Sequence, residues 1–232
     1  MQNRRNAKFL TAYLADHGYL VAALDHSEVI APELQRPPTE TDEEKNARWR
    51  RVIGSRVPDI RFLLQQIAGR EAIDMQRIGI VGHSAGGWTA LAAPDAEPLI
   101  RAIVAFVPGG ASNPKPGILP ATLDFKWQHE IPTLLVAAEN DTSLPLDGMF
   151  EIFGRIPSTQ KSMAVLHGAD HMHFVDDIEK LHEGFRIATG YPPEVAAIQH
   201  EMRPISDLTS EENAHRFLRD VTLAHFDRYL RQ

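Results

Sequence analysis

One serine stands between two glycines where an apolar run ends and a small-residue run begins, in the stretch VGHSAGG (Val81 to Gly87). The preceding run, RIGIVGH, is typical of a buried strand, and the following run, AGGWTALAA, is typical of a helix. A strand that passes through Gly-x-Ser-x-Gly directly into a helix turns so tightly that it lifts the serine hydroxyl above the sheet edge. The pattern therefore predicts that Ser84 is a nucleophile.

The glycines and the helix that follow Ser84 are predicted to serve the same chemistry. Gly82 and Gly86 are expected to give the turn room, and Gly87 to let the helix pack closely on the sheet. Free N–H groups and the positive dipole end at the start of that helix suit an oxyanion. Because the five-residue pattern also occurs by chance, the interpretation depends on finding partners for the serine.

A serine hydroxyl is a weak nucleophile at neutral pH, so Ser84 needs a histidine base and an acid that orients the base. Asp141 follows the apolar run IPTLLVAAE, and His171 follows the run KSMAVLHG. Both lie just past a predicted strand, where ligands and catalysis gather in open α/β sheets. We therefore predict a catalytic triad of Ser84, Asp141 and His171.

Each partner of the serine has an alternative. Glu139 is a second candidate acid, but it lies nearer to its strand than Asp141 does. His167 is expected to lie within the strand, and His173 is expected to point away from His171 in an extended loop. Asp141 and His171 are therefore preferred.

The other histidines are predicted to have no catalytic role. His83, next to the serine, is expected to pack or to shape the pocket. A metal site of His171 and His173 with Asp170 and Asp176 has no supporting ligand spacing, so we predict neither a metal nor a cofactor. Five more histidines are expected at the surface or on helix faces: His129, His182, His200, His215 and His225.

The composition restricts the class of protein. A chain of 232 residues, 43% hydrophobic and 24% charged, predicts a single domain over residues 1–232. A net charge of -7 argues against a nucleic-acid partner, and the absence of cysteine excludes a thiolate nucleophile. No apolar stretch approaches the roughly 20 residues of a membrane span. With no recognisable signal peptide, the chain is expected to be cytoplasmic.

Helical and strand patterns alternate along the chain. Helices are predicted at residues 6–18, 39–70, 85–93, 146–157 and 208–230. Strands are predicted at residues 19–25, 77–83, 100–108, 131–139 and 161–168. Loops are expected at residues 26–40, 108–130 and 176–208. This order predicts an α/β fold, with a mostly parallel sheet covered by helices on both faces.

Four stretches together resemble the α/β-hydrolase superfamily, especially its dienelactone hydrolase and platelet-activating-factor acetylhydrolase-like serine esterases: LADHGYLVAALDH, GHSAGGWTALAA, IPTLLVAAENDTSLP and GADHMHF. The resemblance covers residues from about 5 to 232. It implies the α/β-hydrolase fold and hydrolysis of a small-molecule ester through an acyl-serine. Ser84 would be the nucleophile, His171 the base and then the acid, and Asp141 its orienting residue. Dienelactone hydrolases proper use a cysteine, so the serine esterase branch is favoured.

The resemblance also implies an oxyanion hole with one N–H from Ala85 and a second from a His-Gly-x-x-Gly loop after an earlier strand. The chain has neither that loop nor that strand, so an N-terminally shortened fold is expected, with a gap between residues 19–25 and 77–83. Alternatively, these two strands pair directly and the second donor comes from near Gln2 and Asn3. A homo-oligomer that completes the sheet is a further possibility.

Three classes of function follow from these observations. The leading prediction is a carboxylesterase that acts on small to medium carboxylic esters. A serine peptidase-like hydrolase would share the triad, but it usually carries an additional domain. A weak or inactive scaffold is the third class, because the loss of one oxyanion donor typically costs about 10²–10³ in kcat.

Overall fold

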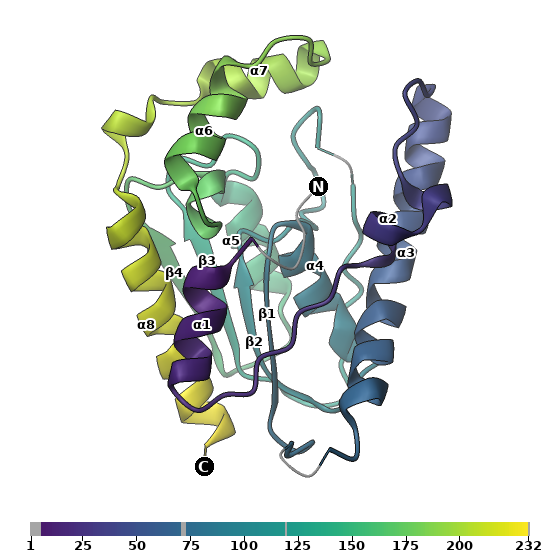
Figure 1. Ribbon diagram of the computed structural model, residues 1–232, viewed down its shortest axis with the longest axis vertical. Coiled ribbons are helices and arrows are strands. Elements are labelled where there is room, and N and C mark those ends of the chain that lie inside the picture. Colours follow the sequence, from purple (N-terminus) through teal and green to yellow (C-terminus); the bar gives the residue numbers. More distant parts are fainter. Residues whose placement is uncertain (1–5, 71–72, 119, 232) are drawn as a thin grey trace.

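A four-stranded parallel sheet forms the centre of the fold in this computed structural model, which describes residues 6–70, 73–118 and 120–231 (Figure 1). The strand order is β1-β2-β3-β4, and each neighbouring pair is parallel. The strands are β1 (Ile78–His83), β2 (Ile100–Phe106), β3 (Thr133–Ala138) and β4 (Lys161–Leu166). Parallel strands need long crossover connections. A helix lies between β1 and β2 (Ala85–Ala92) and another between β3 and β4 (Leu146–Arg155), whereas the described residues between β2 and β3 form no helix.

The helices match the predicted ones and add others in regions that were expected to be loops. They are α1 (Lys8–Asp16), α2 (Ser27–Ile30), α3 (Asp42–Ile67), α4 (Ala85–Ala92), α5 (Leu146–Arg155), α6 (Ile178–Ile187), α7 (Pro193–Glu201) and α8 (Glu211–Leu230). The expectation of a loop over residues 176–208 is wrong, because α6 and α7 lie there. Within the described ranges, no helix combines the length and the hydropathy that a membrane crossing requires.

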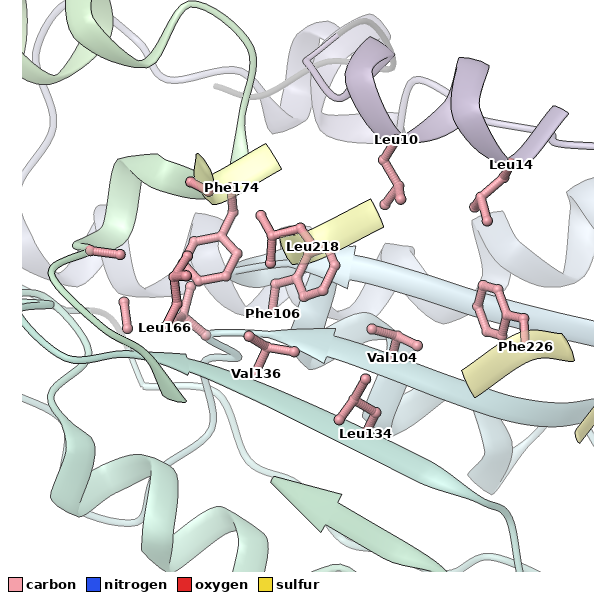
Figure 2. Close-up of a cluster of buried hydrophobic side chains, with 14 of the residues drawn as sticks. Leu10, Leu14, Val104, Phe106, Leu134, Val136, Leu166, Phe174, Leu218 and Phe226 are labelled. Carbon is pink, nitrogen blue, oxygen red and sulfur yellow. The ribbon is translucent and has the colours of Figure 1, made fainter. Parts of the chain in front are cut away.

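Helices cover both faces of the sheet, as predicted. On one face, residues of β2 and β3 pack against α1 and α8 (Figure 2): Leu10, Leu14, Val104, Phe106, Leu134, Val136, Leu218 and Phe226. On the other face, the alternate strand residues Ile103, Ala105 and Leu135 pack in one cluster with Leu91 of α4 and with Met149 and Ile152 of α5. Every residue of β3 is buried, as expected for a strand covered on both sides.

The predicted strand at residues 19–25 is absent from the structure. This segment connects α1 to α2, and no backbone hydrogen bond joins its described residues Tyr19–Leu24 to Ile78–Gly82 of β1. Direct pairing of the two segments, one of the alternatives, is therefore wrong. A cavity of about 420 Å³ is lined by both segments, so the expected gap is present. The segment is apolar, but its residues are half-buried or exposed instead of buried, because a buried strand also requires a hydrogen-bonded neighbour.

Candidate active site

Ser84 lies in a strained turn between β1 and α4. Its backbone has φ 57° and ψ -117°, a region that residues other than glycine rarely adopt. The Ser84 N–H donates to the carbonyl oxygen of Phe106 (2.9 Å), and the Ser84 carbonyl accepts from the N–H of Trp88 (2.9 Å). These bonds to β2 and α4 hold the strained conformation, in which a strand-to-helix turn exposes its serine.

Two of the three glycines around Ser84 are required by packing. A Cβ added to Gly82 would lie 2.2 Å from the carbonyl oxygen of Gly86, and one added to Gly87 would lie 3.0 Å from the carbonyl oxygen of Phe106. Gly87 therefore allows the close approach of α4 to β2, as predicted. A Cβ on Gly86 would meet nothing within 4 Å, so the expectation that Gly86 gives the turn room is wrong.

Gly82→Ala is expected to destabilise the fold, whereas Gly86→Ala is expected to leave it intact. The new methyl group of Gly82→Ala would overlap backbone that has to move, and such overpacking typically costs about 1–3 kcal/mol or more. At this chain length, each kcal/mol lowers the Tm by roughly 2–4 °C. Thermal unfolding of both variants measures the difference. Equal melting temperatures would contradict the tight packing of the turn.

The structure brings Ser84, His171 and Asp141 together in a continuous chain of hydrogen bonds. The Oγ of Ser84 lies 3.1 Å from Nε2 of His171, and Nδ1 of His171 lies 2.7 Å from Oδ2 of Asp141. Asp141 follows β3, and His171 begins the short 3₁₀ turn η3 (His171–Phe174) after β4. Three neighbouring regions of the sheet edge thus supply the arrangement that activates a serine by general-base catalysis.

The Asp141 carboxylate is fixed so that one oxygen faces His171. Its side chain is fully buried, and its Oδ1 accepts hydrogen bonds from the N–H groups of Ser143 and Leu144, both at 2.8 Å. Burial disfavours the charged form of His171, but the charge and the hydrogen bond of Asp141 outweigh burial and raise the pKa of His171 above its usual value. His171 is therefore a stronger base than a free imidazole.

The alternative acid and bases have other partners. The Glu139 carboxylate lies 2.7 Å from Nδ1 of His167 and accepts from the N–H of Gly168 at 2.9 Å. His167 follows the end of β4 and its side chain is 91% exposed, so its expected position within the strand is wrong. His173 is fully buried and contacts Asp170.

A buried cluster next to His171 was not predicted from the sequence. The two oxygens of Asp170 lie 2.8 Å from Nδ1 of His173 and 2.6 Å from Nε2 of His182, and both imidazoles are fully buried. Burial opposes ionisation of Asp170, but its bonds to the two histidines hold its pKa below the usual range. Asp170 also accepts from the N–H of Met172 (2.9 Å). The cluster therefore ties η3, which carries His171, to α6.

His83 supports the catalytic histidine from the end of β1. Its Nε2–H donates to the carbonyl oxygen of His171 at 3.0 Å, and its ring stacks on Phe174 with the ring centroids 5.4 Å apart. Burial and the neighbouring charge of His171 lower the pKa of His83 well below its usual value. The neutral His83 thus positions the His171 loop, in agreement with its predicted packing role.

Three of the histidines that were expected at the surface or on helix faces lie on helices and are buried: His182, His215 and His225. The ring of His215 stacks on Phe9 with centroids 3.7 Å apart. Burial lowers the pKa of His225 to about 4, and its Nε2 lies 3.3 Å from the carbonyl oxygen of Pro132. Both residues belong to α8, so they pack this helix against the rest of the fold.

The N-terminus of α4 offers one oxyanion donor. Ala85 is the first residue of α4, so its N–H has no acceptor within the helix and remains available beside Ser84. In one of the alternatives, the second donor comes from near Gln2 and Asn3, and these residues lie outside the described ones.

Among the described residues outside the site, two acids and a histidine lie close enough together to be compared with a metal site. Atoms of His26, Glu28 and Asp59 lie within 4.8 Å of one another. Glu28, however, is ion-paired with Arg56, and Asp59 accepts from the Oγ (2.5 Å) and the N–H (2.9 Å) of Ser27. Because Arg56 already supplies the positive charge, this cluster fits an internal ion-pair network better than a metal centre.

The parallel sheet, the strained turn at Ser84 and the acid and histidine after successive strands define an α/β-hydrolase fold. Ferulic acid esterase from Streptomyces cinnamoneus shares this fold, with a TM-score of 0.55 and 24% identity over 78% of this chain and 49% of the esterase. The sequence model of the PETase family, described as PET hydrolase-like, matches residues 2–183 of this chain. The chain belongs to the PET hydrolase-like family, which confirms the resemblance to serine esterases of the α/β-hydrolase superfamily.

Two curated relatives are similar over about two thirds of the chain. A bis(hydroxyethyl) terephthalate hydrolase from Streptomyces coelicolor is 26% identical over 161 residues, which are 68% of this chain and 43% of the relative. A cutinase from Thermobifida alba is 25% identical over 163 residues, which are 68% of this chain and 46% of the cutinase. The matched part of this chain thus spans less than half the length of either relative.

Proposed function

We propose that this protein hydrolyses carboxylic esters through an acyl-serine intermediate. The observation that carries the proposal is the hydrogen-bonded chain from Ser84 through His171 to Asp141, built on a strained turn. The family membership and the names of the relatives, a terephthalate-ester hydrolase and a cutinase, support the same reaction class.

The reaction proceeds in two halves. In the first, Nε2 of His171 takes the proton of the Ser84 hydroxyl while Oγ attacks the ester carbonyl carbon, and the N–H of Ala85 stabilises the oxyanion. The C–O bond to the alcohol then breaks, and the imidazolium of His171 protonates the departing alkoxide. In the second half, His171 takes a proton from water, the resulting hydroxide attacks the acyl carbon, and Ser84 leaves with the proton restored.

The substrate class that we propose is a small to medium carboxylic ester, including diesters of aromatic acids. The support for the aromatic acids comes from the relative that acts on bis(hydroxyethyl) terephthalate. We place this substrate in one panel with p-nitrophenyl acetate, butyrate and octanoate, so that acyl size and aromatic character are compared directly.

Covalent labelling combined with turnover tests the proposal. A fluorophosphonate is expected to label the protein once, on the peptide that contains Ser84, and the labelled protein is expected to lose its esterase activity. Mass spectrometry identifies the labelled residue, and initial rates on the ester panel measure turnover. Labelling elsewhere, or rates equal to those of buffer for every ester, would exclude the proposed function.

A further inference from the structure

Two helices that follow the catalytic histidine, α6 and α7, lie at the end of the molecule where the strands finish (Figure 1). We name residues 178–203, which hold both helices, the cap. The side-chain amide of Gln199 in α7 donates to the carbonyl oxygens of Phe185 and Ala188, so it fastens the two helices together. The family model ends at residue 183, and the cap therefore extends beyond the part of the fold that this model matches.

A loop that begins beside the nucleophile reaches the cap. It follows β2, and we name its residues 109–118 the β2 loop. The N–H of Gly109 donates to the carbonyl oxygen of Ser84 at 3.2 Å. The first residue of the β2 loop is thus bonded to the turn that carries the catalytic hydroxyl.

The β2 loop contacts α7 near both ends of this helix. A Cβ built on Gly117 lies 3.2 Å from the Cβ of Glu194, the second residue of α7. Lys115 forms an ion pair with Glu201, the last residue of α7. The loop and the helix therefore lie side by side, joined by one packing contact and one pair of charges.

The cap is also attached beside the acid of the triad. The guanidinium of Arg203 donates to the side-chain oxygen of Asn140 at 3.2 Å, and Asn140 directly precedes Asp141. The N–H of Asn140 donates to the carbonyl oxygen of Ala169 at 2.8 Å, which joins the segment after β3 to the segment that leads to His171. The cap is thus fastened to the loops after β2 and after β3.

These two attachments lie between the strands that carry the nucleophile and the base. In the sheet order β1-β2-β3-β4, Ser84 follows β1 and His171 follows β4, so the loops after β2 and β3 lie between them. Ser84 is half-buried, and the side chain of His171 is 21% exposed. An ester that approaches Ser84 therefore meets the cap at this edge of the sheet.

We propose that the cap limits the size of the ester that reaches Ser84, and that the ion pair between Lys115 and Glu201 holds the cap against the β2 loop. This inference rests on the proposed ester hydrolysis. The Lys115 and Glu201 side chains are 26% and 53% exposed, and exposed ion pairs are weak. Small esters enter while the pair is formed, whereas larger esters require α7 and the β2 loop to separate.

Charge reversal at the ion pair tests the proposal through a ratio of rates. Glu201→Lys places two lysines together, and it is expected to raise kcat/KM for p-nitrophenyl octanoate and for bis(hydroxyethyl) terephthalate at least about threefold relative to p-nitrophenyl acetate. The double variant Lys115→Glu/Glu201→Lys restores opposite charges and is expected to restore the ratio. Asp124→Lys is the matched control, because it disrupts an exposed ion pair with Lys126 that does not involve the cap.

An engineered disulfide tests the same proposal by holding the cap closed. The chain contains no cysteine, and the 3.2 Å between the two Cβ positions is slightly below the roughly 3.5–4.5 Å of disulfides. Gly117→Cys/Glu194→Cys, oxidised with glutathione disulfide, is expected to lose at least about fivefold in kcat/KM for the two larger esters relative to the acetate. Dithiothreitol is expected to restore the ratio in the same sample. Gly117 has φ 87°, and any strain from its substitution is present in both redox states.

The ratio of large to small esters separates the possible outcomes, because both rates come from one sample and the folded fraction cancels. No turnover of any ester would overturn the proposed function and this inference with it. Turnover of the acetate with an unchanged ratio in Glu201→Lys and in the oxidised disulfide variant would overturn the inference alone. An equal change of the ratio in Asp124→Lys would also overturn it, since the effect would then be one of surface charge. Glu194→Cys, which forms no internal disulfide, is expected not to respond to dithiothreitol, and the redox comparison decides the matter even if Glu201→Lys fails to fold.

Discussion

Ser84→Ala is expected to reduce ester hydrolysis to the background rate. The Oγ of Ser84 is the atom that attacks the ester, and it is the group from which His171 takes a proton at 3.1 Å. Removing the nucleophile of a comparable serine triad lowers kcat by about 10⁶. The backbone bonds that hold the turn come from the N–H and C=O of residue 84, so the alanine variant keeps them. Initial rates on p-nitrophenyl acetate measure the loss.

Ser143→Ala is the matched control for this experiment. Ser143 lies in the loop beside the site, and it contacts Asp141 through its backbone N–H, which alanine retains. Its removal is expected to leave the rate within about twofold and the fluorophosphonate label in place, since surface substitutions usually have small effects. If Ser84→Ala kept a rate close to that of Ser143→Ala, another group would have to be the nucleophile.

The four strands of the sheet and the positions of the three site residues were predictable because their signals are local. Val81 to Gly87 encodes a strand, a turn and a helix within seven residues. Asp141 and His171 each follow an apolar run, and parallel strands bring their carboxyl ends to one edge. Each strand end can therefore be predicted from local sequence, and the parallel sheet then brings the three distant residues together.

Features that depend on distant neighbours were not predictable in this way. Residues 19–25 have the composition of a strand, but a strand forms only where another backbone edge is within hydrogen-bonding reach. Among the described residues, no backbone hydrogen bond joins Tyr19–Leu24 to Ile78–Gly82 of β1. His182 and His215 are polar residues in polar-looking helices, and only the packing of α6 and α8 reveals that they are buried. The spacing of Asp170 and His173 was the sole local signal of the cluster around His171.

Asp141→Asn is expected to lower kcat/KM by about 10⁴ at neutral pH. The Oδ1 atom of residue 141 accepts from Ser143 and Leu144, so asparagine keeps its carbonyl oxygen there and turns its NH₂ group towards Nδ1 of His171. Nδ1 must then accept a hydrogen bond, which moves the imidazole proton to Nε2. Nε2 faces Ser84, so the imidazole no longer has a lone pair with which to take the serine proton.

The pH profile of the same variant distinguishes this mechanism from a loss of structure. His171 must be neutral to act as a base, and Asp141 raises its pKa above the ordinary 6.5. The kcat/KM of the wild type is therefore expected to rise with increasing pH, with the midpoint of the rise above pH 6.5. Without the Asp141 charge, the pKa of His171 falls, and the rising limb of kcat/KM moves to lower pH. Asp170→Asn, which leaves the bond between Asp141 and His171 intact, is the control, with an expected loss of about tenfold or less. A loss of similar size in both variants, with an unshifted limb, would mean that Asp141 does not orient the base.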